Sequence, residues 1–262
     1  IFEEQVSENG TNWIVADVVQ GPGPSSQPSM SLAMSERTSW IAAGYPRLEA
    51  GSRVLVYDGT QDRWKAETEL MSPFGDQETW FGHSVDLSND GNILVVGAPV
   101  LDSSSESSSG AVFVYRRDLN GTWTTMGTHL VGRETNEFFG WSVSLSSSGL
   151  RLAVGAPISS DTTGLVRIYD WDGDSWSQTG SDIVGDVPLN RFGSSVCLSD
   201  DGSVLAVGAP GSGFEPGQVR VFRFLGGQFE ADENVFVGDE ETEGFGSSVS
   251  LSGDGSILAA GG

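Results

Sequence analysis

The 262-residue sequence contains very little cysteine, histidine and lysine. Cys197 is its single cysteine, which excludes an internal disulfide and a cysteine-rich metal site. The two histidines, His83 and His129, are too few for the cluster of ligands that a typical zinc hydrolase needs. Lys65 is the single lysine, and 36 acidic residues against 13 basic ones give a net charge of −23. Because nucleic acids and anionic membranes repel such a chain, we expect neither as a partner.

Long apolar runs and helical patterns are also missing. No apolar run approaches the ~20 residues that span a bilayer, so we expect no membrane insertion. No segment has the periodicity of an amphipathic helix. The chain starts at Ile1 without a signal-like segment, which predicts a mature product or a piece of a longer protein. Its share of apolar residues, 37%, together with 36 glycines, is sufficient for a folded core.

A pattern of Phe-Gly, then Asp-Gly or Ser-Gly, then Gly-Ala-Pro dominates the sequence. It occurs in residues 81–99, 139–157 and 192–210, and it begins again in 245–262. A weaker copy without Phe-Gly lies at 28–46. A repeat of about 50 residues is typical of solenoids, propellers and arrays, and the composition of the unit must decide among them.

Each repeat predicts four short antiparallel strands. An alternating strand is followed by a tight turn and then by a nearly continuous apolar strand. A third strand ends in a second turn, and a fourth begins with an aromatic residue. Four such strands describe the blade of a β-propeller, so we predict an all-β, single-domain propeller with five visible repeats. The predicted blades are 28–80, 81–138, 139–191, 192–244, and a composite of 245–262 with 1–27.

The composite blade follows from the two ends of the chain. Residues 1–13 match 112–123, so the chain starts in a third strand, and it stops after a second strand. The N-terminal strands are therefore expected to complete the last blade, and a closed ring leaves no free sheet edge. The alternative is a fragment of a ring with more blades, because the sequence stops at Gly262 where a proline is expected.

The three-part motif resembles the FG-GAP repeat, which is best known from the propeller head of integrin α-subunits. The resemblance covers essentially the whole chain, and it implies an extracellular or secretory-pathway protein that serves in recognition and adhesion. Integrin-type repeats often hold calcium in an acidic loop between the first two strands, but here that loop has at most two acidic residues. Because calcium takes about six to eight oxygen ligands, we expect calcium-free turns and no cofactor, as in a short-loop variety of the repeat.

One acidic string and two sequons are candidate sites. Asp170, Asp172 and Asp174 alternate along the chain and form a candidate calcium site, although the same positions in other repeats are plain turns. Asn9 and Asn120 each begin an Asn-Gly-Thr sequon in an expected turn, which makes them glycosylation candidates if the protein is secreted. Asn-Gly is also a turn-forming pair, so structure alone accounts for both.

Acidic residues gather in the segments that link successive blades. In a four-stranded blade these links share one face with the variable loops after Gly-Ala-Pro, and loops on a rigid scaffold often bind partners. We therefore predict an acidic face that binds a protein partner. Its candidate residues are Glu78, Glu134, Glu137, Asp186, Asp239, Glu240, Glu241 and Glu243.

Catalysis has little support in the sequence. His83 aligns with Trp141, Ser194 and Ser247 of the other repeats, so no catalytic cluster recurs. Neither a serine triad nor a phosphate-binding loop is recognisable. We expect a non-enzymatic recognition, adhesion or structural module, on its own or in a larger assembly. The alternatives are a cation-dependent carbohydrate-binding module and a glycoside-type hydrolase with paired carboxylates.

Overall fold

The computed structural model describes the backbone of residues 2–7 and 10–15, and all atoms of 31–46, 51–60, 64–75, 79–100, 109–158, 163–211, 216–239 and 244–262. Every helix or strand that it assigns in these ranges is a β-strand. Within the same ranges, no helix is long and apolar enough to cross a lipid bilayer. The prediction of an all-β protein is confirmed.

Four sheets follow one another along the chain and are numbered here as blades 1 to 4. All strand pairs within these sheets are antiparallel, and each sheet lies within one predicted blade. Blade 1 holds β3 (Ser31–Met34), β4 (Trp40–Tyr45), β5 (Arg53–Asp58) and β6 (Lys65–Met71). Blade 2 holds β7 (Ser84–Leu87), β8 (Ile93–Ala98), β9 (Ala111–Arg117), β10 (Trp123–Thr125) and β11 (Leu130–Val131). Blade 3 holds β12 (Ser142–Leu145), β13 (Arg151–Ala156), β14 (Leu165–Trp171), β15 (Trp176–Gln178) and β16 (Ile183–Val184). Blade 4 holds β17 (Ser195–Leu198), β18 (Val204–Ala209), β19 (Gln218–Leu225) and β20 (Gln228–Val237).

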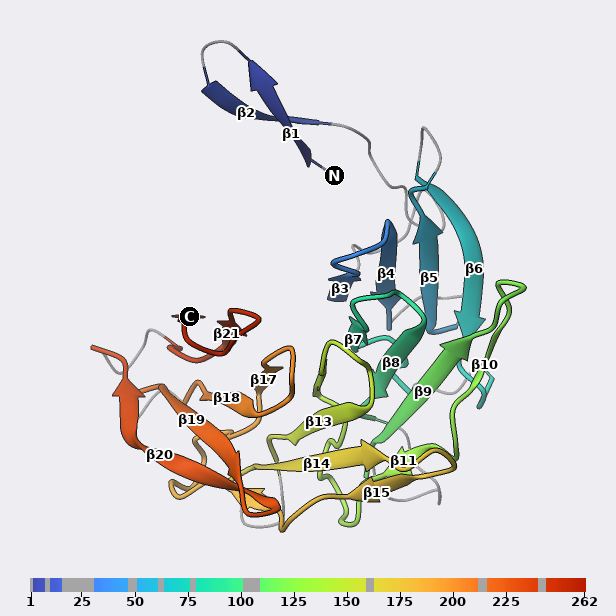
Figure 1. Cartoon of the computed structure of the whole chain (residues 1–262). Helices are drawn as coiled ribbons and strands as arrows, with labels where there is room; N and C mark the ends of the chain where they lie inside the picture. The colour runs from blue at the N-terminus through green and yellow to red at the C-terminus, as the bar shows by residue number, and fades with distance from the viewer. Residues whose placement is uncertain are drawn as a thin grey trace.

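The blades stand around an arc, with their first strands inside and their fourth strands outside (Figure 1). First strands of successive blades pack on one another: β3 on β7, β7 on β12, and β12 on β17. The second strands β8 and β18 are buried along their whole length, whereas β6 and β20 are mostly exposed. This is the propeller-like arrangement that the repeat predicts.

The repeated glycines explain how neighbouring blades join. A Cβ added to Gly97, in the Gly-Ala-Pro of blade 2, would lie 2.1 Å from the carbonyl oxygen of Gly140 in blade 3. That oxygen also accepts a hydrogen bond from Ser84 Oγ at 2.9 Å. Gly140 itself has a φ of 89° and donates its N–H to the Gly155 carbonyl oxygen at 3.1 Å. Since glycine alone suits both positions, Phe-Gly and Gly-Ala-Pro must occur together. The same close approach occurs at Gly44 with Gly82, Gly155 with Gly193, and Gly208 with Gly246.

A second link joins the first strands of successive blades. Asp86 Oδ2, on β7, accepts the N–H of Leu145 on β12 at 2.7 Å. The acceptor at the equivalent position changes from blade to blade, but the bond is kept. Ser144 Oγ accepts the Leu198 N–H at 3.0 Å, and Cys197 Sγ accepts the Leu251 N–H at 3.3 Å. The single cysteine thus has a structural contact.

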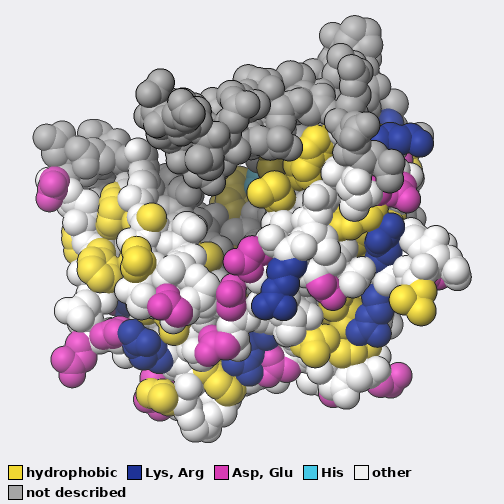
Figure 2. Space-filling view, turned by 45° about the horizontal axis from the view of Figure 1, so that its top comes forward, with side chains coloured by type: hydrophobic (Ala, Val, Ile, Leu, Met, Phe, Trp, Pro, Cys, Tyr) yellow, Lys and Arg dark blue, Asp and Glu magenta, His cyan; other side chains and the backbone are white. Residues whose placement is uncertain are grey.

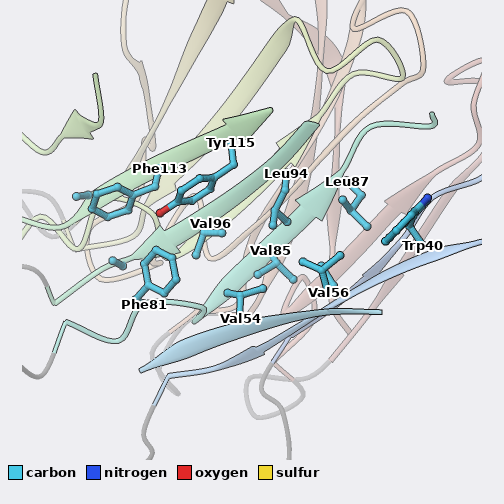
Figure 3. Close-up of a cluster of buried hydrophobic side chains, with 13 residues drawn as sticks. Trp40, Val54, Val56, Phe81, Val85, Leu87, Leu94, Val96, Phe113 and Tyr115 are labelled. Atoms are coloured by element: carbon cyan, nitrogen blue, oxygen red, sulfur yellow. The ribbon is translucent and has the colours of Figure 1, made fainter. Parts of the chain in front are cut away.

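Hydrophobic side chains fill the space between adjacent blades. Phe81, Phe139 and Phe192, the phenylalanines of the Phe-Gly pairs, are at most 1% exposed. Figure 3 shows Phe81 in the cluster between blades 1 and 2, which includes Val54 and Val85. Burying one such side chain is worth about 2 to 3 kcal/mol. Each Phe-Gly pair therefore anchors its blade and places the glycine at the joint.

The two ends of the chain, which the sequence predicts to share one blade, each form a hairpin. β1 (Phe2–Ser7) and β2 (Gly10–Val15) form one antiparallel hairpin, and β21 (Ser248–Leu251) and β22 (Leu258–Gly261) form another. In the described part of the chain these hairpins are separate two-stranded sheets, and Figure 1 shows the first hairpin apart from the arc. Among the described residues, a Cβ added to Gly261 would meet no atom within 4 Å, so they do not make the blade-to-blade contact there. Both halves have the predicted hairpin form, and their union in one blade stays a prediction.

Candidate functional site

The residues that flank the Phe-Gly pairs form the same turn in every described copy. The residue before the phenylalanine accepts a hydrogen bond from the N–H three residues later, as from His83 to Trp80 at 2.9 Å. Its φ is 52° at Trp80, 56° at Phe138, 56° at Arg191 and 62° at Gly244. Bulky residues rarely adopt this left-handed conformation, and such strain tends to gather at functional sites. We call these positions the Phe-Gly rim, and it consists of Trp80, His83, Phe138, Trp141, Arg191, Ser194, Gly244 and Ser247.

Three aromatic side chains and a histidine meet on the rim between blades 2 and 3. The ring centre of His83 lies 4.5 Å from that of Trp141 and 5.7 Å from that of Trp80. Phe138 packs edge-on against Trp141 at 6.2 Å. All four side chains are half-buried, so part of each ring faces solvent. Figure 2 shows that the surface is hollowed near the centre of the arc, where hydrophobic side chains and a histidine lie at the border. The rim thus combines flat apolar ring faces with an imidazole.

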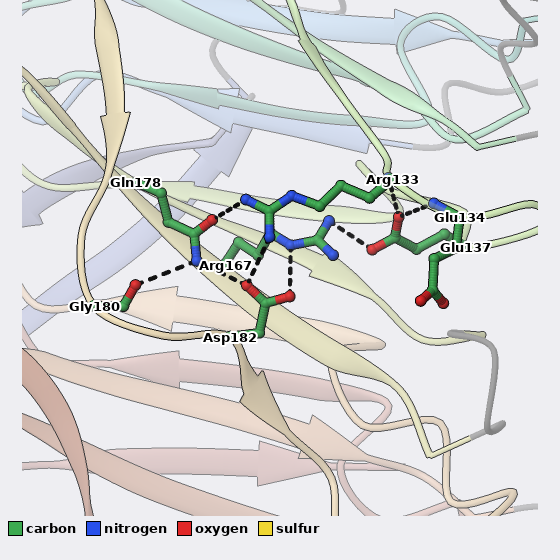
Figure 4. A network of polar contacts seen from close by, with 7 residues as sticks. All are labelled: Arg133, Glu134, Glu137, Arg167, Gln178, Gly180 and Asp182. Carbon is green, nitrogen blue, oxygen red and sulfur yellow. Dashed lines mark hydrogen bonds and ion pairs between the residues drawn. The ribbon is translucent and has the colours of Figure 1, made fainter.

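Glu137, a predicted binding residue, is instead part of a buried ion-pair network (Figure 4). Its side chain is 0% exposed, and Oε1 lies 2.6 Å from Arg167 Nη1, which belongs to a side chain that is 2% exposed. Oε2 accepts the backbone N–H groups of Arg133 and Glu134. Arg167 Nε donates to Asp182 Oδ2 at 2.9 Å on its other side. The prediction that Glu137 contributes to a solvent-facing surface is therefore wrong, because its carboxylate neutralises a buried arginine.

The other predicted acidic residues do not come together in the described part of the chain. Glu134 and Asp239 are exposed. Asp186 is 59% exposed and lies 3.2 Å from Arg220 Nη1. The remaining candidates fall outside the described residues, so the acidic face as a whole stays a prediction. These candidates are Glu78, Glu240, Glu241 and Glu243.

The candidate calcium ligands are used within their own blade. Arg151 binds Asp170 through two hydrogen bonds, of 2.7 and 2.8 Å. Burial works to raise the pKa of Asp170, but hydrogen bonds from Arg151 and Thr179 outweigh it and lower that pKa. Asp172 accepts the backbone N–H groups of Ser175 and Asp174 in its turn, and these bonds lower its pKa. No cluster of three metal-binding side chains occurs among the described residues, so the structure does not assemble these three carboxylates into a site.

The two sequons are placed differently. Asn120 is exposed in the turn between β9 and β10, where an attached glycan would point to solvent. Asn9 lies outside the described residues. Glycosylation of both residues stays a prediction.

Part of the chain matches a known repeat family. Residues 64–115 match the FG-GAP repeat, and they cover the end of blade 1 and most of blade 2. The chain contains the FG-GAP repeat. The resemblance seen in the sequence is thereby confirmed, and the other three blades repeat the same joints. No curated protein is similar enough to the sequence to count as a match.

Several solved structures share the fold. The periplasmic gluconolactonase of Pseudomonas aeruginosa has a TM-score of 0.63 at 19% identity, over 96% of this chain and 71% of that protein. A provisionally assigned 6-phosphogluconolactonase of Bacteroides uniformis has a TM-score of 0.60 at 13% identity, over 88% of this chain and 63% of that protein. The hydrazine synthase of Kuenenia stuttgartiensis has a TM-score of 0.58 at 16% identity, over 95% of this chain and 58% of that protein. At these identities the likeness shows the fold.

These findings correct the functional prediction made from the sequence. The structures named above are lactonases and a synthase, and they contradict the expected non-enzymatic adhesion module. The FG-GAP repeat and the propeller stand, while the integrin-like adhesion role and the glycoprotein character gain no support.

Sequence reasoning missed the rim because it sought residues that recur. His83 was not assigned a catalytic role, because the other repeats hold Trp141, Ser194 and Ser247 at its position. Yet the positions beside them, Phe-Gly and Ser-Val, hardly change from copy to copy. The signal for the rim is that the residues flanking Phe-Gly vary while Phe-Gly and Ser-Val stay constant. The constant residues fix the backbone, so the side chains at the variable positions can differ in function.

Proposed function

We propose that this chain is a hydrolase that opens a sugar-derived lactone at the Phe-Gly rim. The observation that carries the proposal is His83, held beside Trp80 and Trp141 at the inner edge of the arc. The names of two structures with the same fold, a gluconolactonase and a provisionally assigned 6-phosphogluconolactonase, support this reaction class. A shared fold alone does not fix a function, so the proposal rests on the rim residues.

Hydrolysis of a sugar lactone needs an apolar surface for the sugar ring and a base for the water, and the rim has groups for both. The C–H face of a sugar ring needs a flat apolar surface, and the half-buried rings of Trp80 and Trp141 offer one. The attacking water needs a base, and an imidazole nitrogen can accept a proton from water.

The reaction is a balanced ring opening. The water oxygen forms a bond to the lactone carbonyl carbon, and His83 accepts a proton from that water. The bond between the carbonyl carbon and the ring oxygen then breaks. The proton passes from His83 to the ring oxygen, and a hydroxy acid leaves the rim.

The test is hydrolysis of glucono-δ-lactone, followed as acid release and corrected for the spontaneous rate in buffer. We expect His83→Gln to lower kcat/KM by about 100-fold, because general base catalysis typically contributes that much or more. The matched control is His129→Gln, which changes the other histidine, an exposed residue that stacks on Phe113 away from the rim. Binding of the lactone without turnover, or an unchanged rate in His83→Gln, would show that the proposal is wrong.

The proposal keeps the predicted extracellular or secretory-pathway location. The periplasmic origin of the gluconolactonase supports a secreted protein, and the high negative charge is compatible with one. A protein partner stays a prediction from the sequence.

A further inference from the structure

Arg191 is the one charged residue among the four that precede the phenylalanines of the described Phe-Gly pairs. The others are Trp80, Phe138 and Gly244. In blade 4 the turn is the same as in blades 2 and 3, because the Ser194 N–H donates to the Arg191 carbonyl oxygen at 3.1 Å. The φ of Arg191 equals that of Phe138, at 56°. Equal backbone geometry sends the two side chains off in the same direction relative to their blades.

Side chains that leave the turn in this direction lie on the Phe-Gly rim. The rings of Trp80 and Phe138 both reach Trp141, with centre-to-centre distances of 6.5 and 6.2 Å. Arg191 holds the same position one blade after Phe138, so its side chain starts from the same inner edge. The Ser194 hydroxyl beside it donates to the Arg191 carbonyl oxygen at 2.7 Å and holds the turn.

Within the described part of the chain, the charge of Arg191 is not paired with a carboxylate. Among the described residues, seven arginines form ion pairs with carboxylates, whereas Arg191 forms none. Its side chain is also exposed. In a chain with 36 acidic and 13 basic residues, an unpaired arginine on a rim of apolar rings is the feature that an anionic group would meet.

We propose that Arg191 binds an anionic group, a phosphate or a carboxylate, on the substrate. The inference rests on the proposed function and narrows it: the preferred substrate is a sugar lactone that carries a negative charge away from the lactone carbonyl. The planar guanidinium donates two parallel hydrogen bonds to either oxyanion. The tryptophans contact the sugar ring, and His83 accepts a proton from the water that attacks the lactone carbonyl carbon.

The first experiment measures binding and needs no turnover. Isothermal titration compares glucitol, glucitol 6-phosphate and gluconate, which differ in carrying no charge, a phosphate or a carboxylate. We expect the anionic compound that fits to bind at least 10-fold more tightly than glucitol, and we expect Arg191→Gln to abolish that difference. Arg191→Lys keeps the positive charge but lacks the planar guanidinium, so it should retain part of this difference in affinity. The matched control is Arg37→Gln, which removes an arginine between β3 and β4 that likewise has no ion pair among the described residues.

The second experiment separates this inference from the proposed function. In hydrolysis of 6-phosphogluconolactone, Arg191→Gln should lower kcat/KM about 30-fold, with less than a 2-fold effect on glucono-δ-lactone. Equal binding of charged and neutral compounds would overturn the role of Arg191, whether or not any lactone is hydrolysed. Preferential binding of the charged compound without hydrolysis would support Arg191 and overturn the lactonase. An equal loss for both lactones in Arg191→Gln would mean that the residue acts in general structure and not in recognition.

Discussion

The joint between blades 2 and 3 and the joint between blades 3 and 4 have the same backbone and different charged groups. In both, a glycine of Gly-Ala-Pro meets the carbonyl of the next Phe-Gly, and a serine hydroxyl donates to that carbonyl. At the first joint, Glu137 pairs with the buried Arg167. At the second, Asn190 holds the position of Glu137, and the equivalent Arg220 pairs with the exposed Asp186.

The difference shows which parts of the repeat are fixed by geometry and which are open to change. Arg167 is 2% exposed and lies between two carboxylates, whereas Arg220 is 18% exposed and has one. Nε of Arg220 and Oδ1 of Asn190 are buried without a hydrogen bond among the described residues. The frame of glycines and serines therefore joins the blades in both places, while the charged residues set how strongly each joint is held.

The largest effect is expected where the first joint loses its charge. Glu137→Gln keeps the shape of the side chain but leaves Arg167 with Asp182 as its remaining carboxylate. Breaking a buried ion pair in this way typically costs about 3 to 5 kcal/mol, and urea unfolding measures it. Asp186→Asn makes the equivalent change at the second joint, and it should cost less than about 1 kcal/mol because that pair faces solvent. Similar losses in the two variants would contradict the distinction between the joints.

The next effect tests the frame that the joints share. Gly155→Ala places a Cβ 2.1 Å from the Gly193 carbonyl oxygen, whereas the same change at Gly261 meets no atom of the described residues within 4 Å. We expect Gly155→Ala to lower the free energy of unfolding by about 3 kcal/mol, since backbone atoms must move apart. Gly261→Ala should change it by less than about 0.5 kcal/mol. A large loss at Gly261 as well would indicate that a further blade covers β22 in solution.

Another prediction uses the acceptor on the first strands, which is Asp86 at the first joint and Ser144 at the second. Burial raises the pKa of Asp86 from 3.8 to about 6, against the opposing effect of hydrogen bonds from Leu145 and Leu87. The folded protein therefore keeps this proton at pH values where the unfolded chain has lost it. Its contribution to stability falls as pH rises from about 4 to about 6, by roughly 3 kcal/mol in total.

Asp86→Ser isolates this contribution, because it copies the acceptor of the second joint and does not titrate. Urea unfolding of both proteins across this pH range should show the wild type losing about 3 kcal/mol relative to the variant. Carboxylates with lowered pKa values, such as Asp170 and Asp201, act in the opposite sense in both proteins and cancel in the comparison. A difference between the two proteins that stays constant with pH rules out Asp86 as the titrating group.

Most of the fold could be predicted from the sequence, because it depends on local and repeated features. The spacing of Phe-Gly and Gly-Ala-Pro gave the blades, and the alternating and continuous apolar runs gave the order of strands within them. These patterns report backbone conformation and burial, which act over a few residues.

The site could not be predicted in the same way. Glu137 looks like any acidic loop residue until β14 brings Arg167 against it, and this contact exists only in the folded blade. His83 and Trp141 hold the same position in successive repeats, so only the packing of the blades brings their rings together. Contacts between repeats depend on how the blades pack, and one copy of the motif does not contain that information.

The smallest effect is expected from moving the charged group of the first joint to the second. Asn190 is 3% exposed, and its side chain holds the position that Glu137 holds one blade earlier. We expect Asn190→Glu to place a carboxylate beside Arg220 and to raise the free energy of unfolding by about 1 kcal/mol, because the pair remains partly exposed and its desolvation offsets much of the attraction. Asn190→Gln has the same length without the charge and should give no gain. If both variants destabilise equally, the second joint has no room for the longer side chain, and the two joints differ in shape as well as in charge.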